Sequence, residues 1–217
     1  MAAIKARSLY RFYHQGDDET QALCGVDLTL ELGEFVALVG PSGSGKSSLI
    51  ACLAGLDEPD GGVVEIMGAR MSHRPEAVRT RLRGQHIGMV MQAGNLVDHL
   101  SVTDNIGLSQ WLNGRGTPAL ELLEMVGLSH RARAWPAELS GGEAARVALC
   151  VALAASPAII ICDEPTAEVD AAAEDAILSL LNARRATGAA ILVATHSAAL
   201  AAKADRTITL GDGLVVS

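Results

Sequence analysis

Residues 40–47 read GPSGSGKS and fit the phosphate-binding pattern G-x-x-x-x-G-K-[ST]. The glycines of such a loop let backbone N–H groups turn inward, and the helix that follows adds a positive field at its N-terminus. Lys46 would then reach the β- and γ-phosphates of a nucleotide, and the Ser47 hydroxyl would bind Mg²⁺. A chance glycine turn is the alternative, but an apolar run precedes this loop and a helical pattern follows it. The residues expected to contact the nucleotide are Ser42, Gly43, Ser44, Gly45, Lys46, Ser47 and Ser48.

Two carboxylates, Asp163 and Glu164, end the apolar run at residues 159–162. Asp163 can bind Mg²⁺ directly or through water, and Glu164 can polarise the water that attacks a phosphoryl group. The order Asp-Glu-Pro could also start a turn or cap a helix. After a phosphate-binding loop earlier in the chain, the catalytic interpretation is favoured.

Three other polar sites can be interpreted in two ways from the residues alone. Gln92 follows an apolar run, and its amide could sense the γ-phosphate or Mg²⁺; spacing alone favours a polar loop residue. His196 follows another run and could donate to the γ-phosphate, although a lone histidine is more often structural. Ser140, Gly141 and Gly142 start a helical pattern, where they could form an anion site or an ordinary helix cap.

A scaffold must bring these strand and helix ends together. Apolar runs predict strands at residues 22–30, 34–39, 63–67, 87–91, 158–162 and 190–194. Helical periodicity predicts helices at residues 47–54, 103–112, 118–126, 142–155 and 171–186. Alternation of strands and helices implies right-handed crossovers and a parallel sheet whose strands carry ligands at their carboxyl ends.

The chain therefore belongs to the α/β class, and we expect one domain over residues 1–217. Residues 1–92 and 156–217 would form the nucleotide-binding core. The helical stretch at residues 93–155 would form an inserted lobe that carries Ser140.

Composition excludes some functions. The chain has 217 residues, a formal net charge of −8 and no block of basic residues, which argues against nucleic acid as a partner because backbone phosphates need clustered Lys and Arg. No segment reaches the roughly 18 consecutive apolar residues of a membrane span, and the N-terminus leads into no signal-peptide stretch. The four cysteines are scattered, which favours free thiols in a reducing cytosol. We expect a cytoplasmic protein that contacts a membrane only through a partner.

From Tyr10 onward the chain resembles ATP-binding subunits of the ABC transporter superfamily. Residues 139–143 (LSGGE) resemble the signature of that family, and residues 158–166 (AIIICDEPT) resemble its Walker B strand. In the same order, Gln92 falls at the Q-loop, residues 167–170 at the D-loop and His196 at the switch histidine. Tyr13 falls at the position of the aromatic residue that stacks on adenine.

The resemblance implies a RecA-like P-loop core, an N-terminal antiparallel β subdomain and an inserted helical lobe, with ATP and Mg²⁺ as cofactors. It also implies that Ser140, Gly141 and Gly142 meet the γ-phosphate bound by the opposite subunit, so that two ATP molecules lie between two heads. Asp170 would contribute from the D-loop. Gln92 would take part in catalysis and metal binding, and His196 would hold the transition state.

Within the superfamily, residues 22–28, 33–37, 55–59 and 95–102 look most like the lipoprotein-release, macrolide-export and cell-division group. The chain departs from its relatives at Ala144 and Ala145, where glutamines are usual, and at Ser197, which replaces an aspartate. These departures bear on head-to-head closure and on basal turnover.

The resemblance implies an ATP-hydrolysing subunit that couples dimerisation of two heads, of the same chain, to a separate membrane permease. The permease would dock near residues 92–101, and the substrate would be exported or extracted. A cell-division type of signalling without transport is the alternative. A DNA-maintenance ATPase would need a coiled-coil insertion or a basic surface, and the signature run argues against a small-molecule kinase.

Overall fold

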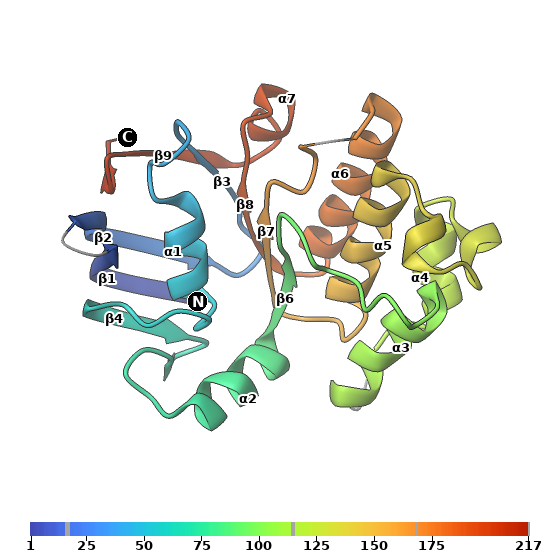
Figure 1. Cartoon of the computed structure of the whole chain (residues 1–217), viewed down its shortest axis with the longest axis horizontal. Coiled ribbons are helices and arrows are strands. Elements are labelled where there is room, and N and C mark those ends of the chain that lie inside the picture. Colours follow the sequence, from blue (N-terminus) through green and yellow to red (C-terminus); the bar gives the residue numbers. More distant parts are fainter. Residues whose placement is uncertain (16–17, 114–115, 168, 217) are drawn as a thin grey trace.

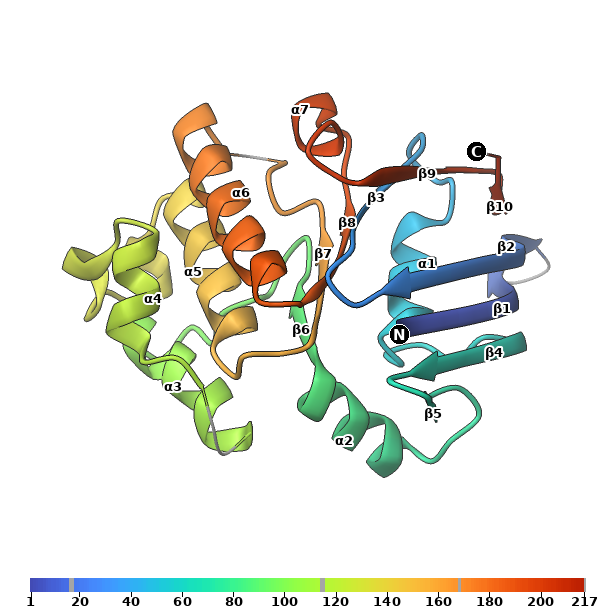
Figure 2. The ribbon, with the colours of Figure 1, turned by 180° about the vertical axis from the view of Figure 1, so that it is seen from behind.

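The computed structural model describes residues 1–15, 18–113, 116–167 and 169–216. Figure 1 shows three parts next to one another: an antiparallel sheet, a central sheet and a group of helices. Figure 2 shows the same arrangement from behind. The central sheet lies between the other two parts, so both pack against the strands that end at the candidate site.

The antiparallel sheet has the order β2-β1-β4-β5, and each of its pairings is antiparallel. Its strands are β1 (Ala2–Gln15), β2 (Asp18–Glu31), β4 (Gly61–Ile66) and β5 (Ala69–Arg70). The register between β1 and β2 shifts at several places, for example between Ala6 and Leu9. Each bulge inserts a residue and interrupts the alternation of faces. The expected antiparallel subdomain is confirmed, but its first strand was not delimited from sequence because these shifts break the pattern.

The central sheet has the order β10-β9-β3-β8-β7-β6. The pairings from β9 to β6 are parallel, as expected, and within the described part of this sheet only the pairing of β10 with β9 is antiparallel. The strands are β3 (Phe35–Val39), β6 (Ile87–Val90), β7 (Ile159–Asp163), β8 (Ala190–Ala194), β9 (Arg206–Gly211) and β10 (Leu214–Val215). The strands β9 and β10 were not predicted from the sequence.

Alternate residues of the central strands enter two separate cores. Val36 and Leu192 join α1 (Lys46–Leu53) and the antiparallel sheet in one core. Phe35, Ile191 and Val193 join α6 (Ala171–Ala186) and the inserted helices in the other. Because both faces are covered, these strands are almost continuously apolar. The remaining helices of the core are α2 (Glu76–His86) and the four-residue α7 (Ala198–Ala201).

The inserted helices form the lobe beside the central sheet (Figure 1). They are α3 (Val102–Asn113), α4 (Ala119–Met125), two short turns η1 (Ser129–Arg131) and η2 (Pro136–Glu138), and α5 (Gly141–Leu153). The end of α5 packs on β6 so closely that a Cβ on Gly88 would lie 2.2 Å from the Ala152 carbonyl oxygen. α5 therefore connects the lobe to the core. We propose that the boundaries between the nucleotide-binding core and the inserted lobe lie at residues 92/93 and 155/156.

In the described ranges, no helix has the length and apolar character needed to cross a membrane. Cys52, Cys150 and Cys162 are buried, and burial raises the pKa of each thiol to about 12. Since a thiolate is the reactive form of cysteine, these three thiols serve as core-filling side chains at neutral pH.

Candidate active site

The glycine loop lies between β3 and α1 and has a backbone that only glycine adopts easily. Gly40, Gly43 and Gly45 have φ values of 156°, 79° and 100°. A Cβ on Gly45 would lie 2.3 Å from the Ala22 carbonyl oxygen. No side chain caps α1 at Gly45, so the first N–H groups of this helix remain available to a phosphate.

Lys46 is held inside this loop, with a relative exposure of 7%. Its Nζ donates to the carbonyl oxygens of Gly40 at 2.9 Å and Pro41 at 3.0 Å. It also lies 3.5 Å from Nε2 of His196. The loop therefore fixes a buried cation at its centre, where it can neutralise phosphate charge.

Asp163 ends β7 and is 3% exposed. Its Oδ1 is buried and has no hydrogen-bond partner among the described residues. A buried carboxylate oxygen without a partner is costly, and a hard divalent cation would satisfy it. Ser47 and Gln92 line the same cavity as Asp163. This set of oxygen ligands fits Mg²⁺.

Glu164 follows directly and has a φ of 53°, which is rare for a residue with a side chain. Its N–H donates to the Ala194 carbonyl oxygen at 2.9 Å. Its carboxylate lies 3.2 Å from His196 Nε2 and accepts from the His196 backbone N–H at 3.2 Å. The ends of two neighbouring strands thus hold a carboxylate and an imidazole together, beside the Lys46 ammonium. This arrangement can orient a water and hold its proton.

A cavity of about 700 Å³ contains most of the predicted nucleotide contacts. Its lining includes Tyr13, Ser42, Gly43, Gly45, Lys46, Ser47, Ser48, Gln92, Asp163, Glu164 and His196. Ser44 differs, because it is 2% exposed and its Oγ is buried without a partner among the described residues. The lining also includes Thr166, the last residue of the stretch that resembles the Walker B strand, and Thr20 and Thr195, which no motif in the sequence singled out.

The structure does not bring Ser140, Gly141, Gly142 or Asp170 to this cavity. Ser140 caps α5: its Oγ accepts from the Glu143 N–H at 3.3 Å, and Glu143 accepts from the Ser140 N–H at 2.9 Å. The helix-cap alternative is therefore realised. Capping uses a lone pair of the hydroxyl and leaves its proton to donate, so the cap and an anion site are compatible.

Glu143 has a second partner that the sequence did not indicate. Arg131 Nε donates to Glu143 Oε1 at 2.7 Å. The Ser140 N–H and the Arg131 guanidinium lower the pKa of Glu143 to about 2. The η1 turn thereby fastens the start of α5. Asp170 likewise caps α6 by accepting from the Ala173 N–H at 2.8 Å, while Glu168 of the expected D-loop lies outside the described residues.

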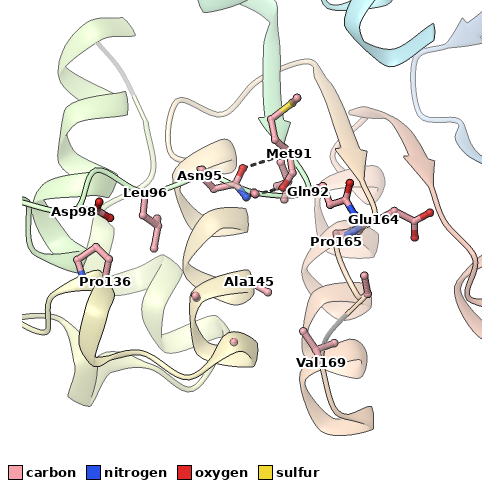
Figure 3. Close-up of a pocket in the computed structure, with 16 residues that line it drawn as sticks. Met91, Gln92, Asn95, Leu96, Asp98, Pro136, Ala145, Glu164, Pro165 and Val169 are labelled. Atoms are coloured by element: carbon pink, nitrogen blue, oxygen red, sulfur yellow. Dashed lines mark hydrogen bonds between the residues drawn. The ribbon is translucent and has the colours of Figure 1, made fainter. Parts of the chain in front are cut away.

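A second cavity, of about 580 Å³, lies between the segment after β6, the lobe and the residues Glu164, Pro165, Ala167 and Val169. Gln92 and Glu164 line both cavities. Figure 3 shows how Asn95 closes the loop after β6: its Oδ1 accepts from the Met91 N–H at 2.7 Å, and its Nδ2 donates to the Met91 carbonyl oxygen at 2.6 Å. Gly141 also lines this cavity. The segment after β6, which Asn95 holds in place, therefore connects the inserted lobe to the cavity that contains Lys46.

Three features define a P-loop nucleotide-hydrolysing protein: the parallel sheet, the glycine loop after β3, and the two carboxylates at the end of β7, which is separated from β3 by β8. The family model described as "ABC transporter" matches residues 23–167. The chain therefore belongs to the ABC transporter family, and it is an ABC-type ATPase.

Relatives and solved structures agree with this assignment. The chain is 44% identical over 220 residues to the lipoprotein-releasing system ATP-binding protein LolD of Ruegeria sp. (strain TM1040), covering 98% of this chain and 97% of that protein. It is 42% identical to the macrolide export ATP-binding/permease protein MacB of Chlorobium luteolum, covering 96% of this chain and 32% of that protein. The dimeric cassette MJ0796 superposes with a TM-score of 0.94 at 35% identity, covering 99% and 97% of the two chains. The same cassette is known in a dimeric post-hydrolysis state with ADP and Pi, with a TM-score of 0.93 at 34% identity and the same coverage.

Proposed function

We propose that this chain is the ATP-hydrolysing subunit of a membrane complex in which closure of two heads on Mg–ATP drives a separate permease. The observation that carries this proposal is the buried Oδ1 of Asp163, which has no partner within the described part of the chain and lies beside the Glu164–His196 pair in the cavity that contains Lys46. A relative named for lipoprotein release and one named for macrolide export support export or extraction of a lipophilic, lipoprotein or drug-like substrate.

Binding of the nucleotide is assigned to the glycine loop and its neighbours. Lys46 neutralises the β- and γ-phosphates, and the N–H groups of the loop cradle them. Ser47, Asp163 and Gln92 would hold Mg²⁺, which supplies charge neutralisation on the phosphate oxygens when it is bound. Tyr13 stacks on adenine at the edge of the cavity.

Hydrolysis is assigned to two residues that touch each other. Glu164 takes the proton of the attacking water, because its carboxylate is held by His196 at the rim of the Lys46 cavity. His196 donates to the γ-phosphate and stabilises the charge that develops there. Both side chains reach this position because β7 and β8 are adjacent parallel strands.

Two heads complete each site. Ser140, Gly141 and Gly142 lie on the lobe, at the start of α5, and neither Ser140 nor Gly142 lines the cavity that contains Lys46. They therefore serve the γ-phosphate held by a second copy of the chain, and Asp170 faces the same interface. The dimeric cassettes support this assembly.

The permease docks on the segment after β6. Asn105 holds this segment in place: its Oδ1 accepts from the Val97 N–H at 2.8 Å, and its Nδ2 donates to the carbonyl oxygens of Val97, Leu100 and Ser101 at 3.2, 3.0 and 3.0 Å. Leu96, Val97 and Leu100 are half-buried and line a preformed surface. We place the subunit on the cytoplasmic face of the membrane, where it contacts the bilayer only through the permease.

The test is reconstitution. The chain is co-purified with its membrane partner, placed in vesicles, and ATP hydrolysis and release of lipoprotein from the bilayer are measured together. ATP-dependent release that stops in the Glu164→Gln complex would support the proposal. Hydrolysis with normal coupling to the partner but no release or flux would instead favour the signalling function.

A further inference from the structure

Arg11 connects the antiparallel sheet to the segment that follows α1. Its Nε and Nη2 donate to the two carboxylate oxygens of Asp57 at 2.8 and 2.9 Å, and its Nη1 donates to Asp60 at 3.0 Å. Its side chain is only 20% exposed. A planar guanidinium bound by two carboxylates in this way has little freedom left.

The same guanidinium lies over the ring of Tyr13, with its central carbon 4.5 Å from the ring centroid. Arg11 and Tyr13 are two residues apart on β1, so their side chains leave the same face of the sheet. The Tyr13 hydroxyl donates to Asp57 Oδ2 at 2.9 Å. The Tyr13 ring is therefore held at one face by Arg11 and at its hydroxyl by Asp57, and these two residues also bind each other.

Tyr13 also lines the cavity that contains Lys46. Because Arg11 covers one face of the ring, a planar base can stack only on the other face. The Phe12 N–H donates to Asp60 Oδ2 at 2.7 Å, so the strand between Arg11 and Tyr13 is tied to the same acidic segment. The position and tilt of the open face thus depend on Arg11.

We propose that Arg11 is a positioning residue for the nucleotide base: with Asp57 it holds the Tyr13 ring in the orientation in which adenine stacks. This inference rests on the proposed role of Tyr13 in adenine binding. Arg11 acts through Tyr13 and touches neither the phosphates nor the reacting water.

The test compares binding of ADP, which contains the adenine base, with binding of pyrophosphate, which lacks it. Calorimetric titrations of the full chain with ADP and with pyrophosphate are made for Arg11→Gln and for Arg7→Gln. Arg7 is the matched control, because it lies on the same strand and pairs with Glu65 at 3.3 Å, away from Tyr13. We expect Arg11→Gln to weaken ADP binding by about three- to tenfold, as expected for loss of a cation–π contact and the ordering it provides, and to leave pyrophosphate binding unchanged. Arg7→Gln should change neither.

A double-mutant cycle with Tyr13→Ala separates this inference from the proposed function. In the Tyr13→Ala background, Arg11→Gln should weaken ADP binding no further. An equal loss of pyrophosphate binding in Arg11→Gln, or an undiminished effect in the Tyr13→Ala background, would overturn the positioning role while leaving Tyr13 as the adenine contact. If Tyr13→Ala itself leaves ADP affinity unchanged, both the adenine contact and the positioning role are wrong.

Discussion

At the scale of single residues, the reactive groups are held by contacts that involve the backbone as much as side chains. Lys46 is tied to two loop carbonyls, and Glu164 is held in a left-handed conformation with its carboxylate on the His196 N–H. Strained backbone of this kind costs about 1–3 kcal/mol and persists where the surroundings enforce it. The loop and the strand ends enforce it here.

Glu164→Gln is the prediction that tests the base. The amide keeps the size of the side chain and its contact with His196 but cannot take a proton from water. We expect ATP binding to remain and phosphate release to fall by about 100- to 10,000-fold. A phosphate-release assay checks this, and an undiminished rate would refute the assignment of Glu164.

Ser197 supports a second prediction at this scale. Its Oγ donates to Glu174 Oε1 at 2.7 Å and caps α7 by accepting from the Leu200 N–H at 3.1 Å. Ser197→Asp would place a carboxylate against Glu174. We expect the free energy of unfolding to fall by about 1.5–3 kcal/mol, the worth of a hydrogen bond to a charged group.

The control for Ser197→Asp is the same change in a Glu174→Gln background. There the amide can donate to the new carboxylate, so most of the lost stability should return. Chemical denaturation of the four proteins measures both steps. Equal destabilisation in both backgrounds would show that the Ser197–Glu174 contact is not the cause.

The residues to which the proposed function assigns phosphate and metal binding were predictable from the sequence, whereas the long-range ion pairs that support neighbouring parts of the site were not. Lys46 and Asp163 belong to local motifs whose spacing reports their chemistry. Arg11 lies 46 residues from Asp57, and Arg131 lies 12 residues from Glu143. Such pairs form only when the fold brings distant segments together, so no local pattern announces them.

At the scale of elements, the buried strands were predictable because both of their faces are apolar. Strand β9 was missed because strands were expected from apolar runs, and Ile208 and Leu210 of β9 stand among the polar residues Arg206, Thr207 and Thr209. Helix α7 is four residues long, too short to show a period. The shifts in register of β1 hid its alternation. Prediction from apolar runs therefore succeeded for strands that are buried on both faces. It failed for strands with a solvent-exposed face or an irregular backbone.

Gly88→Ala tests the packing of β6 on α5. The new Cβ would lie 2.2 Å from the Ala152 carbonyl oxygen and 2.8 Å from Pro157 Cγ, so strand and helix must separate. We expect a loss of about 1–3 kcal/mol in the free energy of unfolding, as for overpacked cores. Thermal or chemical unfolding checks the value.

Gly107→Ala is the matched control. Gly107 lies inside α3, and a Cβ there would meet none of the described residues within 4 Å. Because alanine favours helix over glycine by about 0.5–1 kcal/mol, this variant should be as stable as the parent or more so. Equal losses in both variants would contradict the close approach of β6 and α5.

At the scale of the whole molecule, each head is an incomplete enzyme under the proposed function. Ser140→Arg and Lys46→Ala should each abolish turnover, while Ser140→Arg should leave ATP binding to an isolated head unchanged. In an equimolar mixture, a dimer of unlike chains holds one site with Lys46 from one chain and Ser140 from the other. We therefore expect ATPase activity to reappear on mixing.

The mixing experiment has a clear contrary outcome. Activity in the Ser140→Arg variant alone, or no activity in the mixture once ultracentrifugation shows that mixed dimers have formed, would contradict sites shared between two chains. Mixing Ser140→Arg with Ser140→Ala supplies the control, because no pairing of these two variants restores an intact signature residue.

The contact between α5 and β6 links the Ser140 end of the helix to the central sheet. Its 13 residues span about 20 Å at 1.5 Å per residue, with Ser140 at one tip and Ala152 resting on Gly88 at the other. We therefore expect that a displacement of Ser140 by a second copy of the chain reaches β6. This strand ends two residues before Gln92, which lines both cavities.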